Sequence, residues 1–171
     1  MGDDITIRPA RRGDDEAALA EIAAVVQQLH FAARPDIFKP VDPSALEAWF
    51  RSALKRPRPG ITLAQLSGAA VGYAISIDAG REDSAFAHPR RWREVDQLAV
   101  LPGYRRRGVA RALIADAAAS ARAAGFPALE LNTWAFNEVA RTTFRRLGFI
   151  ERNMRHELVV DRQVAASPNP D

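Results

Sequence analysis

The sequence predicts an α/β (α+β) fold: a mixed, mostly antiparallel sheet of six to seven strands, flanked by about four helices. Two apolar runs separated only by Ser67-Gly68 indicate an antiparallel hairpin. A strand, a helix and a second strand follow one another between residues 94 and 134, which implies a parallel, right-handed crossover. Four segments with helical spacing of apolar residues account for the helices.

The composition suits one globular domain. The chain has 171 residues, of which 47% are hydrophobic, 26% are charged and none is Cys. Without Cys there are no disulfides, thiolate zinc sites or cysteine nucleophiles. The three His residues are scattered and none is at ligand spacing, so we expect no metal site. No apolar run reaches the roughly 18 residues of a membrane span. The acidic start, Met1 to Asp4, does not resemble a signal peptide. These features predict a soluble cytoplasmic protein without a membrane partner, with one domain over residues 1–163 and a disordered tail over residues 164–171.

The positive charge of the chain is modest. The net charge is +3 and the sequence pI is about 9.9. Only Lys39 and Lys55 are lysines, so 24 minus 2, or 22, of the basic residues are arginines. Arg keeps its proton in proteins, which by itself raises the pI. Basic composition is therefore weak support for nucleic-acid binding, and we expect no nucleic-acid partner.

The first third of the chain predicts one strand and two helices. Residues 5–7 alternate and stop before a proline, as an edge strand does. Acidic residues followed by apolar residues at helical spacing predict a helix to about His30. Residues 34–43 contain three prolines and read as a loop. The run Ser44-Ala45-Leu46-Glu47 has the capping-box pattern of a second helix, which the run at 56–60 ends.

The remaining elements follow from the same signals. We expect a long polar loop over residues 78–91. Strands are expected at 61–66, 70–77, 94–100, 128–134, 149–154 and 157–160, and helices at 108–124 and 137–147.

The strand at 94–100 has one irregularity. Val95 is apolar at an odd position, whereas Leu98 and Val100 are apolar at even positions. Because the faces of a strand alternate, a change of parity around Asp96-Gln97 indicates one extra residue, a β-bulge in the fourth strand. The alternative is a strand buried on both faces, where parity carries no information.

The run Arg105-Arg106-Arg107-Gly108-Val109-Ala110 stands between this strand and a helix. The first turn of a helix offers backbone N–H groups and a positive dipole end, which bind phosphate. Gly108 and Ala110 lack bulk, and the arginines add charge-assisted contacts. A P-loop would need Gly-Lys-Ser/Thr, and a dinucleotide fingerprint would need three glycines; neither is present. A solvated basic helix start is the alternative interpretation.

Two motifs in this part of the chain resemble those of the GNAT superfamily of N-acetyltransferases, over residues 94–149. The first, similar to its acetyl-CoA-binding motif, is Leu98-Ala99-Val100, then Pro102-Gly103-Tyr104, then Arg105-x-x-Gly108-x-Ala110. The second is the run of Asn137, Ala140, Phe144 and Gly148-Phe149, which resembles the family's Asn…Ala…Tyr…Gly-Phe run.

The resemblance implies acetyl-CoA as acyl donor. In the family, the N–H groups of the turn hold the pyrophosphate, the bulged strand pairs with the pantetheine arm, and the Asn hydrogen-bonds that arm. For Asn137, a role as helix N-cap is an equal alternative. The cofactor-binding residues are then Leu98, Ala99, Val100, Arg105, Arg106, Arg107, Gly108, Val109, Ala110, Arg111, Asn137 and Phe144.

The resemblance also implies direct attack of an amine on the thioester. An alkylamine is mostly protonated near pH 7, so a base must remove a proton first. Asp96 matches the position of an acidic general base in several family members, and Glu94 is the second candidate. A polar strand residue displaced by the bulge is the alternative interpretation of Asp96. A backbone N–H near Leu98 would stabilise the oxyanion.

Phe144 departs from the family pattern, which often has Tyr there to protonate the departing thiolate. Phe cannot donate a proton. With Gly148 at the C′ position, Phe144 and Phe149 would instead make the hydrophobic contact of a Schellman ending. A thiol pKa near 8.5 lets the thiolate leave without an acid, so we expect slower or differently assisted catalysis.

The acceptor amine is not identified by the sequence, and a small molecule or a peptide is compatible with it. By resemblance, its site implicates His30, Phe38, Trp49 and the loop at 78–91, and Trp134 beside Asn132 is a further candidate. Three functions compete: an N-acetyltransferase, an acyl-CoA-binding regulatory module without turnover, and a nucleic-acid-binding protein. The sequence leaves a homodimer open.

Overall fold

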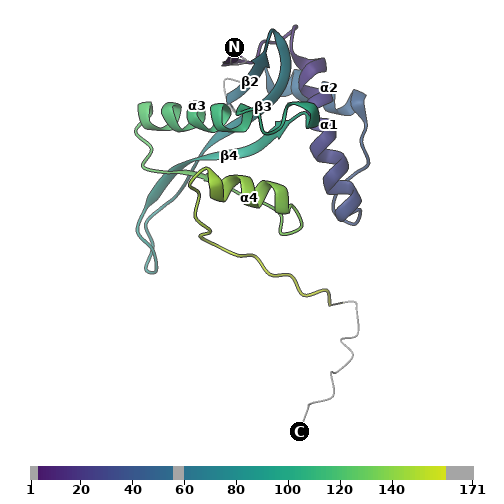
Figure 1. Cartoon of the computed structure of the whole chain (residues 1–171). Coiled ribbons are helices and arrows are strands. Elements are labelled where there is room, and N and C mark those ends of the chain that lie inside the picture. The colour runs from purple at the N-terminus through teal and green to yellow at the C-terminus, as the bar shows by residue number, and fades with distance from the viewer. Residues whose placement is uncertain (1–3, 56–59, 161–171) are drawn as a thin grey trace. The chain divides into compact units, whose positions relative to one another are not determined.

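The computed structural model describes residues 4–55 and 60–160, which form two compact units (Figure 1). The described residues up to Asn137 make the first unit, and those from Glu138 to Val160 make the second. The predicted tail at 164–171 lies outside the described residues, as does most of the run at 56–60.

The first unit contains a five-stranded sheet, with the strands in sequence order. Its strands are β1 (Ile5–Pro9), β2 (Gly60–Leu66), β3 (Ala69–Arg81), β4 (Arg90–Val100) and β5 (Leu129–Leu131). All neighbours are antiparallel except β4 and β5, which are parallel. The mixed, mostly antiparallel class is confirmed, and β1 is an edge strand as expected. The predicted number of six to seven strands is wrong for the described residues, which form five.

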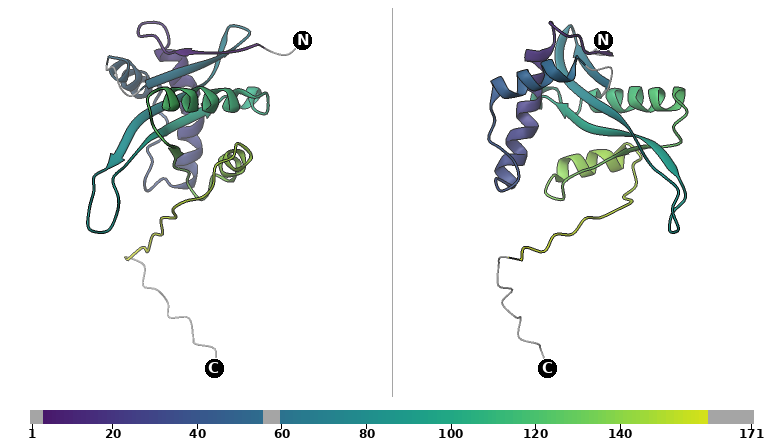
Figure 2. Two further views of the ribbon diagram at one scale, coloured as in Figure 1. Left: turned by 90° about the vertical axis from the view of Figure 1, so that its left-hand side faces the viewer. Right: turned by 180° about the vertical axis from the view of Figure 1, so that it is seen from behind.

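Helices cover both faces of the sheet (Figure 2). In the first unit these are α1 (Glu16–Ala33), α2 (Pro43–Ala53) and α3 (Val109–Ala123), with a 3-10 turn at Pro102–Tyr104. The second unit contains α4 (Glu138–Arg146). Neighbouring residues of β3 show the two faces. Tyr73 packs in the cluster beneath α1 and α2, whereas a Cβ on Gly72 would lie 3.1 Å from Val109 of α3.

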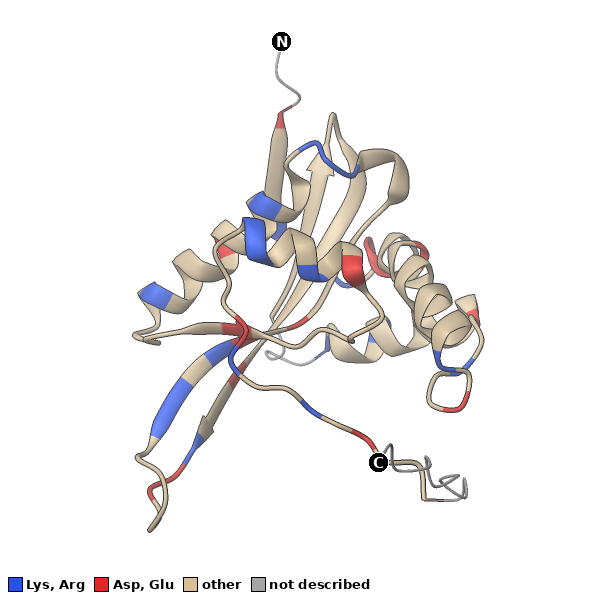
Figure 3. Cartoon of the chain, turned by 60° about the horizontal axis from the view of Figure 1, so that its bottom comes forward, with Lys and Arg blue, Asp and Glu red and all other residues tan. Residues whose placement is uncertain are grey.

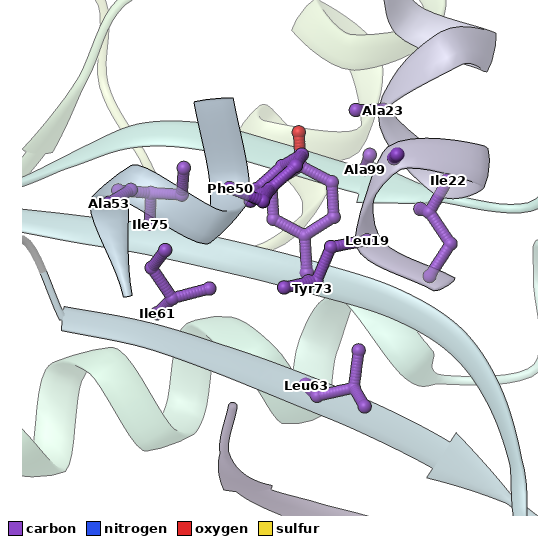
Figure 4. Close-up of a cluster of buried hydrophobic side chains, with 11 residues drawn as sticks. Leu19, Ile22, Ala23, Phe50, Ala53, Ile61, Leu63, Tyr73, Ile75 and Ala99 are labelled. Carbon is purple, nitrogen blue, oxygen red and sulfur yellow. The ribbon is translucent and has the colours of Figure 1, made fainter. Parts of the chain in front are cut away.

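A cluster of buried apolar side chains lies between the sheet and α1 and α2 (Figure 4). Tyr73 and Phe50 meet edge to face at its centre, with ring centroids 5.4 Å apart. Such a pair contributes about 0.5–1.5 kcal/mol beyond the burial of its area. The cluster comprises Leu19, Ala20, Ile22, Ala23, Phe50, Ala53, Ile61, Leu63, Tyr73, Ile75 and Ala99.

The start of α2 differs from the predicted capping box. Asp42, not Ser44, is the N-cap: its Oδ1 accepts a hydrogen bond from the backbone N–H of Ala45, at 3.0 Å. Pro43 occupies the first helical position, where its fixed φ favours a helix and its missing N–H costs nothing. The helix therefore begins at Pro43, whereas the capping box would make Ser44 the N-cap and place it outside the helix.

The hairpin between β2 and β3 is confirmed. Ser67 and Gly68 both have positive φ, 49° and 84°. This is the conformation of a type I′ turn, whose twist matches that of the strands it joins.

The predicted loop at 78–91 is shorter than expected, because strands occupy both of its ends. The strand β3 continues to Arg81, and β4 begins at Arg90, so the loop is shortened to residues 82–89. Charged residues of both signs line this hairpin and gave the sequence its loop-like appearance (Figure 3). One ion pair couples the two strands: Arg93 Nε lies 2.6 Å from Asp78 Oδ1.

The closing strands predicted at 149–154 and 157–160 are wrong. No strand is assigned between residues 149 and 160, and Ile150, Met154 and Leu158 are exposed. Their spacing suited a strand, but a strand also needs a hydrogen-bonding partner, which spacing does not supply. The strand expected at 128–134 is shortened to β5. No helix among the described residues has the length and apolar character of a membrane span.

Candidate functional site

The irregularity in β4 is a β-bulge at Asp96. On β3, Ile75 faces Gln97 and the next residue, Ser76, faces Val95. Asp96 is thus the extra residue that the change of parity predicted. Since a bulge leaves its extra residue outside the regular ladder, the Asp96 side chain is displaced from the alternation of the strand.

Beyond the bulge, β4 and β5 stop pairing. Their ladder covers three residues and ends where Val95 faces Leu131. On its other side, β4 stays paired with β3 as far as Gly72 and Val100. Within the described residues, Leu98 to Val100 have no strand partner on the β5 side. This edge of β4 offers backbone groups for an added extended chain.

Two carboxylates lie at the bulge. Glu94 accepts a hydrogen bond from Asn132 Nδ2 at 2.8 Å and a weaker one from Trp92 Nε1 at 3.4 Å. Asp96 is exposed by surface area, yet desolvation of its carboxyl group and the neighbouring charge of Glu94 raise its pKa. A carboxylate whose proton affinity is raised is a better proton acceptor than an ordinary Asp.

A tyrosine supports the bulge from the buried side. The Tyr73 hydroxyl donates a hydrogen bond to Gln97 Oε1 at 2.8 Å. Burial, together with the charge of Asp96, raises the pKa of Tyr73, so the hydroxyl keeps its proton and remains a donor. Sequence reasoning missed this contact, because residues 24 positions apart are joined only by strand register.

Two residues of the turn before α3 have a positive φ angle. Gly108 is the N-cap of α3, with φ of 91°, and Arg106 has φ of 61°. A positive φ suits glycine and strains other residues. Beneath the turn, the Leu101 N–H donates to Val71 O at 2.9 Å, and Arg105 Nε donates to Val100 O at 3.2 Å.

Residues 105–108 are exposed, and the first turn of the helix that follows has N–H groups without an intrahelical partner. The Arg107 guanidinium lies over the Tyr104 ring, 5.7 Å from its centroid. Of the predicted binding residues, Ala99 and Val109 have buried side chains. Any contact that these two make with a ligand must therefore come from the backbone.

Asn137 and Phe144 belong to different units. Asn137 directly precedes α4, and its N–H donates to Trp134 O at 2.9 Å. In the second unit, the Phe149 N–H donates to Phe144 O at 3.0 Å and the Gly148 N–H donates to Arg145 O at 3.1 Å. With the Phe144 and Phe149 rings 5.8 Å apart, the predicted Schellman ending is confirmed.

Of the acceptor candidates, the structure brings three together with a fourth residue that sequence reasoning missed. His30, Phe38 and Trp134 contact one another or Phe136 through their rings. Phe136 stands two residues after Trp134, just beyond the end of the strand predicted at 128–134. This spacing of two aromatic residues is the signal by which it could have been found. Trp49 does not join this group; it packs against Phe50.

A metal site finds no support in residues 4–55 and 60–160: no three His, Asp or Glu side chains there are grouped closely enough to hold an ion.

The sequence model of the acetyltransferase (GNAT) family matches residues 24–149, about three quarters of the chain. This chain therefore belongs to the GNAT family of acetyltransferases. No curated protein matches it significantly.

Solved structures agree with the fold. A mutant of the BH1408 protein from Bacillus halodurans is 20% identical with a TM-score of 0.83, covering 91% of this chain and 99% of its own. The aminoglycoside N-acetyltransferase AAC(6')-Iy in complex with CoA is 21% identical with a TM-score of 0.62, covering 95% and 98%. The aminoglycoside 6'-N-acetyltransferase AAC(6')-IG from Acinetobacter haemolyticus is 19% identical with a TM-score of 0.62, covering 90% and 97%.

Proposed function

We propose that this protein transfers an acetyl group from acetyl-CoA to a primary amine, by direct attack within a ternary complex. The observation that carries the proposal is the order of features along one stretch of chain. A carboxylate at a bulge is followed by an open strand edge and then by the exposed turn before α3. Membership of an acetyltransferase family supports this combination as a donor and acceptor site.

The turn would hold the pyrophosphate of the donor. The N–H groups from Arg106 to Arg111 would donate to its oxygens, and the arginines would add charge-assisted bonds. The backbone of Leu98 and Val100 would pair with the amides of the pantetheine arm, as a short extra strand does. Asn137 would add a side-chain hydrogen bond to the same arm.

Asp96 would act as the general base. Acetyl-CoA supplies the acetyl group as a thioester: the neutral amine would form a bond to the carbonyl carbon, and the C–S bond would break to release CoA as the thiolate. Asp96 would take the proton of the ammonium group, and Glu94, held by Asn132, is the second candidate for this role. The Leu98 N–H would donate to the carbonyl oxygen as negative charge develops there.

A second function is favoured by Phe144, whose ring cannot protonate a departing thiolate. An acyl-CoA-binding regulatory module would keep the turn and lack turnover. Release of free thiol from acetyl-CoA, measured over a panel of amines, separates the two: thiol release with any amine supports the enzyme. Micromolar binding of CoA without thiol release supports the module.

The test of the donor site is Gly108→Glu. The added carboxylate would stand against the pyrophosphate, so calorimetry should show loss of CoA binding. Gly125→Glu is the matched control, since Gly125 has φ of 74° at the opposite end of α3 and suffers similar backbone strain. Unchanged CoA affinity in Gly108→Glu, or no affinity in the unmodified protein, would refute the donor site.

A further inference from the structure

Four aromatic rings of the first unit form a cluster in which each ring contacts two of the others. His30 lies 4.7 Å from Phe38, Phe38 lies 5.2 Å from Trp134, Trp134 lies 5.7 Å from Phe136, and Phe136 lies 5.7 Å from His30, between ring centroids. The Trp134 and Phe136 rings are nearly parallel, at 20°, and both meet the other pair edge-on. We call these four residues the aromatic cluster.

The aromatic cluster is not part of the buried core. None of its four residues is fully buried, and Trp134 is 39% exposed. The rings come from three segments: the last turns of α1, the loop after it, and the chain that follows β5. Aromatic surface that is held in place and left in contact with solvent is typical of a ligand site.

The loop that carries Phe38 is fixed to α1. The Phe38 N–H donates to Arg34 O at 2.9 Å, and Gln27 Nε2 donates to Lys39 O at 2.6 Å. Arg34 and Asp36 also form an ion pair, 2.7 Å between Nη2 and Oδ2. These contacts hold the Phe38 ring in place before any ligand arrives, which reduces the entropy cost of binding.

The aromatic cluster lies close to the acidic bulge. Asn132, which donates to Glu94, is two residues from Trp134. Two residues of chain span at most about 7 Å between Cα atoms. Burial lowers the pKa of His30, which favours the neutral ring, so this member of the cluster does not repel a cation. Glu94 is thus linked, through its hydrogen bond with Asn132, to the short chain segment that carries Trp134 and Phe136.

We propose that the acceptor is a primary amine joined to an aromatic ring by a short alkyl spacer. The inference rests on the proposed function, because it assigns Glu94 and Asp96 to the ammonium group. The ring of the acceptor would pack on Trp134 and Phe38. An aminosugar presents several hydroxyl or ammonium groups and no aromatic ring, so it would gain less from contact with the aromatic cluster.

The test compares three amines: 2-phenylethylamine, its saturated counterpart 2-cyclohexylethylamine, and glucosamine. Affinities are measured by saturation-transfer NMR, both for the free protein and for the protein with CoA. Stacking between aromatic rings contributes about 0.5–1.5 kcal/mol, so 2-phenylethylamine should bind about 2-fold to 12-fold more tightly than the saturated amine. Glucosamine should bind most weakly.

Variants locate the binding. Trp134→Leu and Phe38→Ala should each weaken 2-phenylethylamine by a similar factor and leave CoA affinity unchanged. Ile37→Ala is the control, since Ile37 is exposed beside Phe38 and makes no ring contact. Equal affinity for the aromatic and saturated amines would overturn the inference. So would an unchanged affinity for 2-phenylethylamine in both Trp134→Leu and Phe38→Ala. If the unmodified protein did not bind CoA, the proposed function would be refuted instead. The amine affinities of the protein without CoA would still decide the inference about the aromatic cluster.

Discussion

Asp96 occupies a position where a carboxylate opposes folding and serves the proposed chemistry. Because its pKa is raised in the folded protein, the folded state holds its proton more tightly than the unfolded chain. Stability therefore falls as the pH rises through the interval between the ordinary and the raised pKa. Asp96→Asn removes this effect, so we expect a higher midpoint of thermal unfolding at pH 7. At a pH below the ordinary Asp value the difference should vanish.

The same substitution should lower activity. A positioned general base contributes about 100-fold or more, so kcat/KM for Asp96→Asn should fall by that factor at pH 7. The ratio of kcat/KM between the wild-type protein and Asp96→Asn should decrease toward pH 9, because more of the amine is already neutral there. Glu21→Gln, an exposed carboxylate on α1, is the control for charge. A rate defect equal at all pH values would assign Asp96 a structural role.

Phe144 is the residue at which leaving-group chemistry can be tested. Phe144→Tyr adds a hydroxyl to a ring whose contact with Phe149 it preserves. If protonation of the thiolate limits turnover, the variant should have a higher kcat, measured by thiol release with a responsive amine. Phe149→Tyr, which places the same hydroxyl on the partner ring, should leave kcat unchanged. An unaltered kcat and pH profile in Phe144→Tyr would mean that loss of the thiolate is not limiting.

At the residue scale, the sequence predicts features that depend only on the alternation of apolar and polar residues within one strand. The parity of Val95, Leu98 and Val100 indicated an extra residue around Asp96-Gln97 and left a strand buried on both faces as the alternative. The register with β3 identifies the extra residue as Asp96. The hydrogen bond from Tyr73 to Gln97 and the contact of Phe136 with His30 depend on register and on tertiary packing. No pattern within one segment contains that information, so these partners could not be found from the sequence.

At the scale of elements, the two possible starts of α2 make different predictions. Asp42→Ala removes the side-chain acceptor of the Ala45 N–H and should lower the free energy of unfolding by about 1 kcal/mol. Ser44→Ala should change it by no more than a few tenths, because Ser44 lies inside the helix. Urea unfolding measures both. A larger loss in Ser44→Ala than in Asp42→Ala would restore the capping box.

Elements were predicted well where their ends carry a chemical signal. Gly125 ends α3 in a left-handed conformation, and Ser67-Gly68 forms the expected turn. Prediction was wrong where an element depends on a distant partner. The strand β3 extends through charged residues because β4 pairs with it along this length, whereas residues 149–160 form no strand.

At the scale of the whole molecule, the two units differ in how they are stabilised. Over residues 4–55 and 60–160, all buried residues lie in the first unit, and residues 138–160 include none. In that second unit, Val139, Ile150 and Val160 are all more than half exposed. A segment without a hydrophobic core of its own does not unfold as an independent cooperative domain. We therefore propose that the chain behaves as the single domain that its sequence predicts for residues 1–163.

Calorimetry of the full chain tests this organisation together with the donor site. We expect one unfolding transition, with the calorimetric enthalpy equal to the van't Hoff enthalpy, because only one unit has a core. CoA at 100 times its Kd stabilises a folded protein by about 2.7 kcal/mol, which for a domain of this size raises the midpoint by about 5–10 °C. The Gly108→Glu protein should keep the single transition and lose this shift, whereas Gly125→Glu should keep both. Two resolved transitions would contradict the single domain, and an equal shift in Gly108→Glu would place CoA away from the turn.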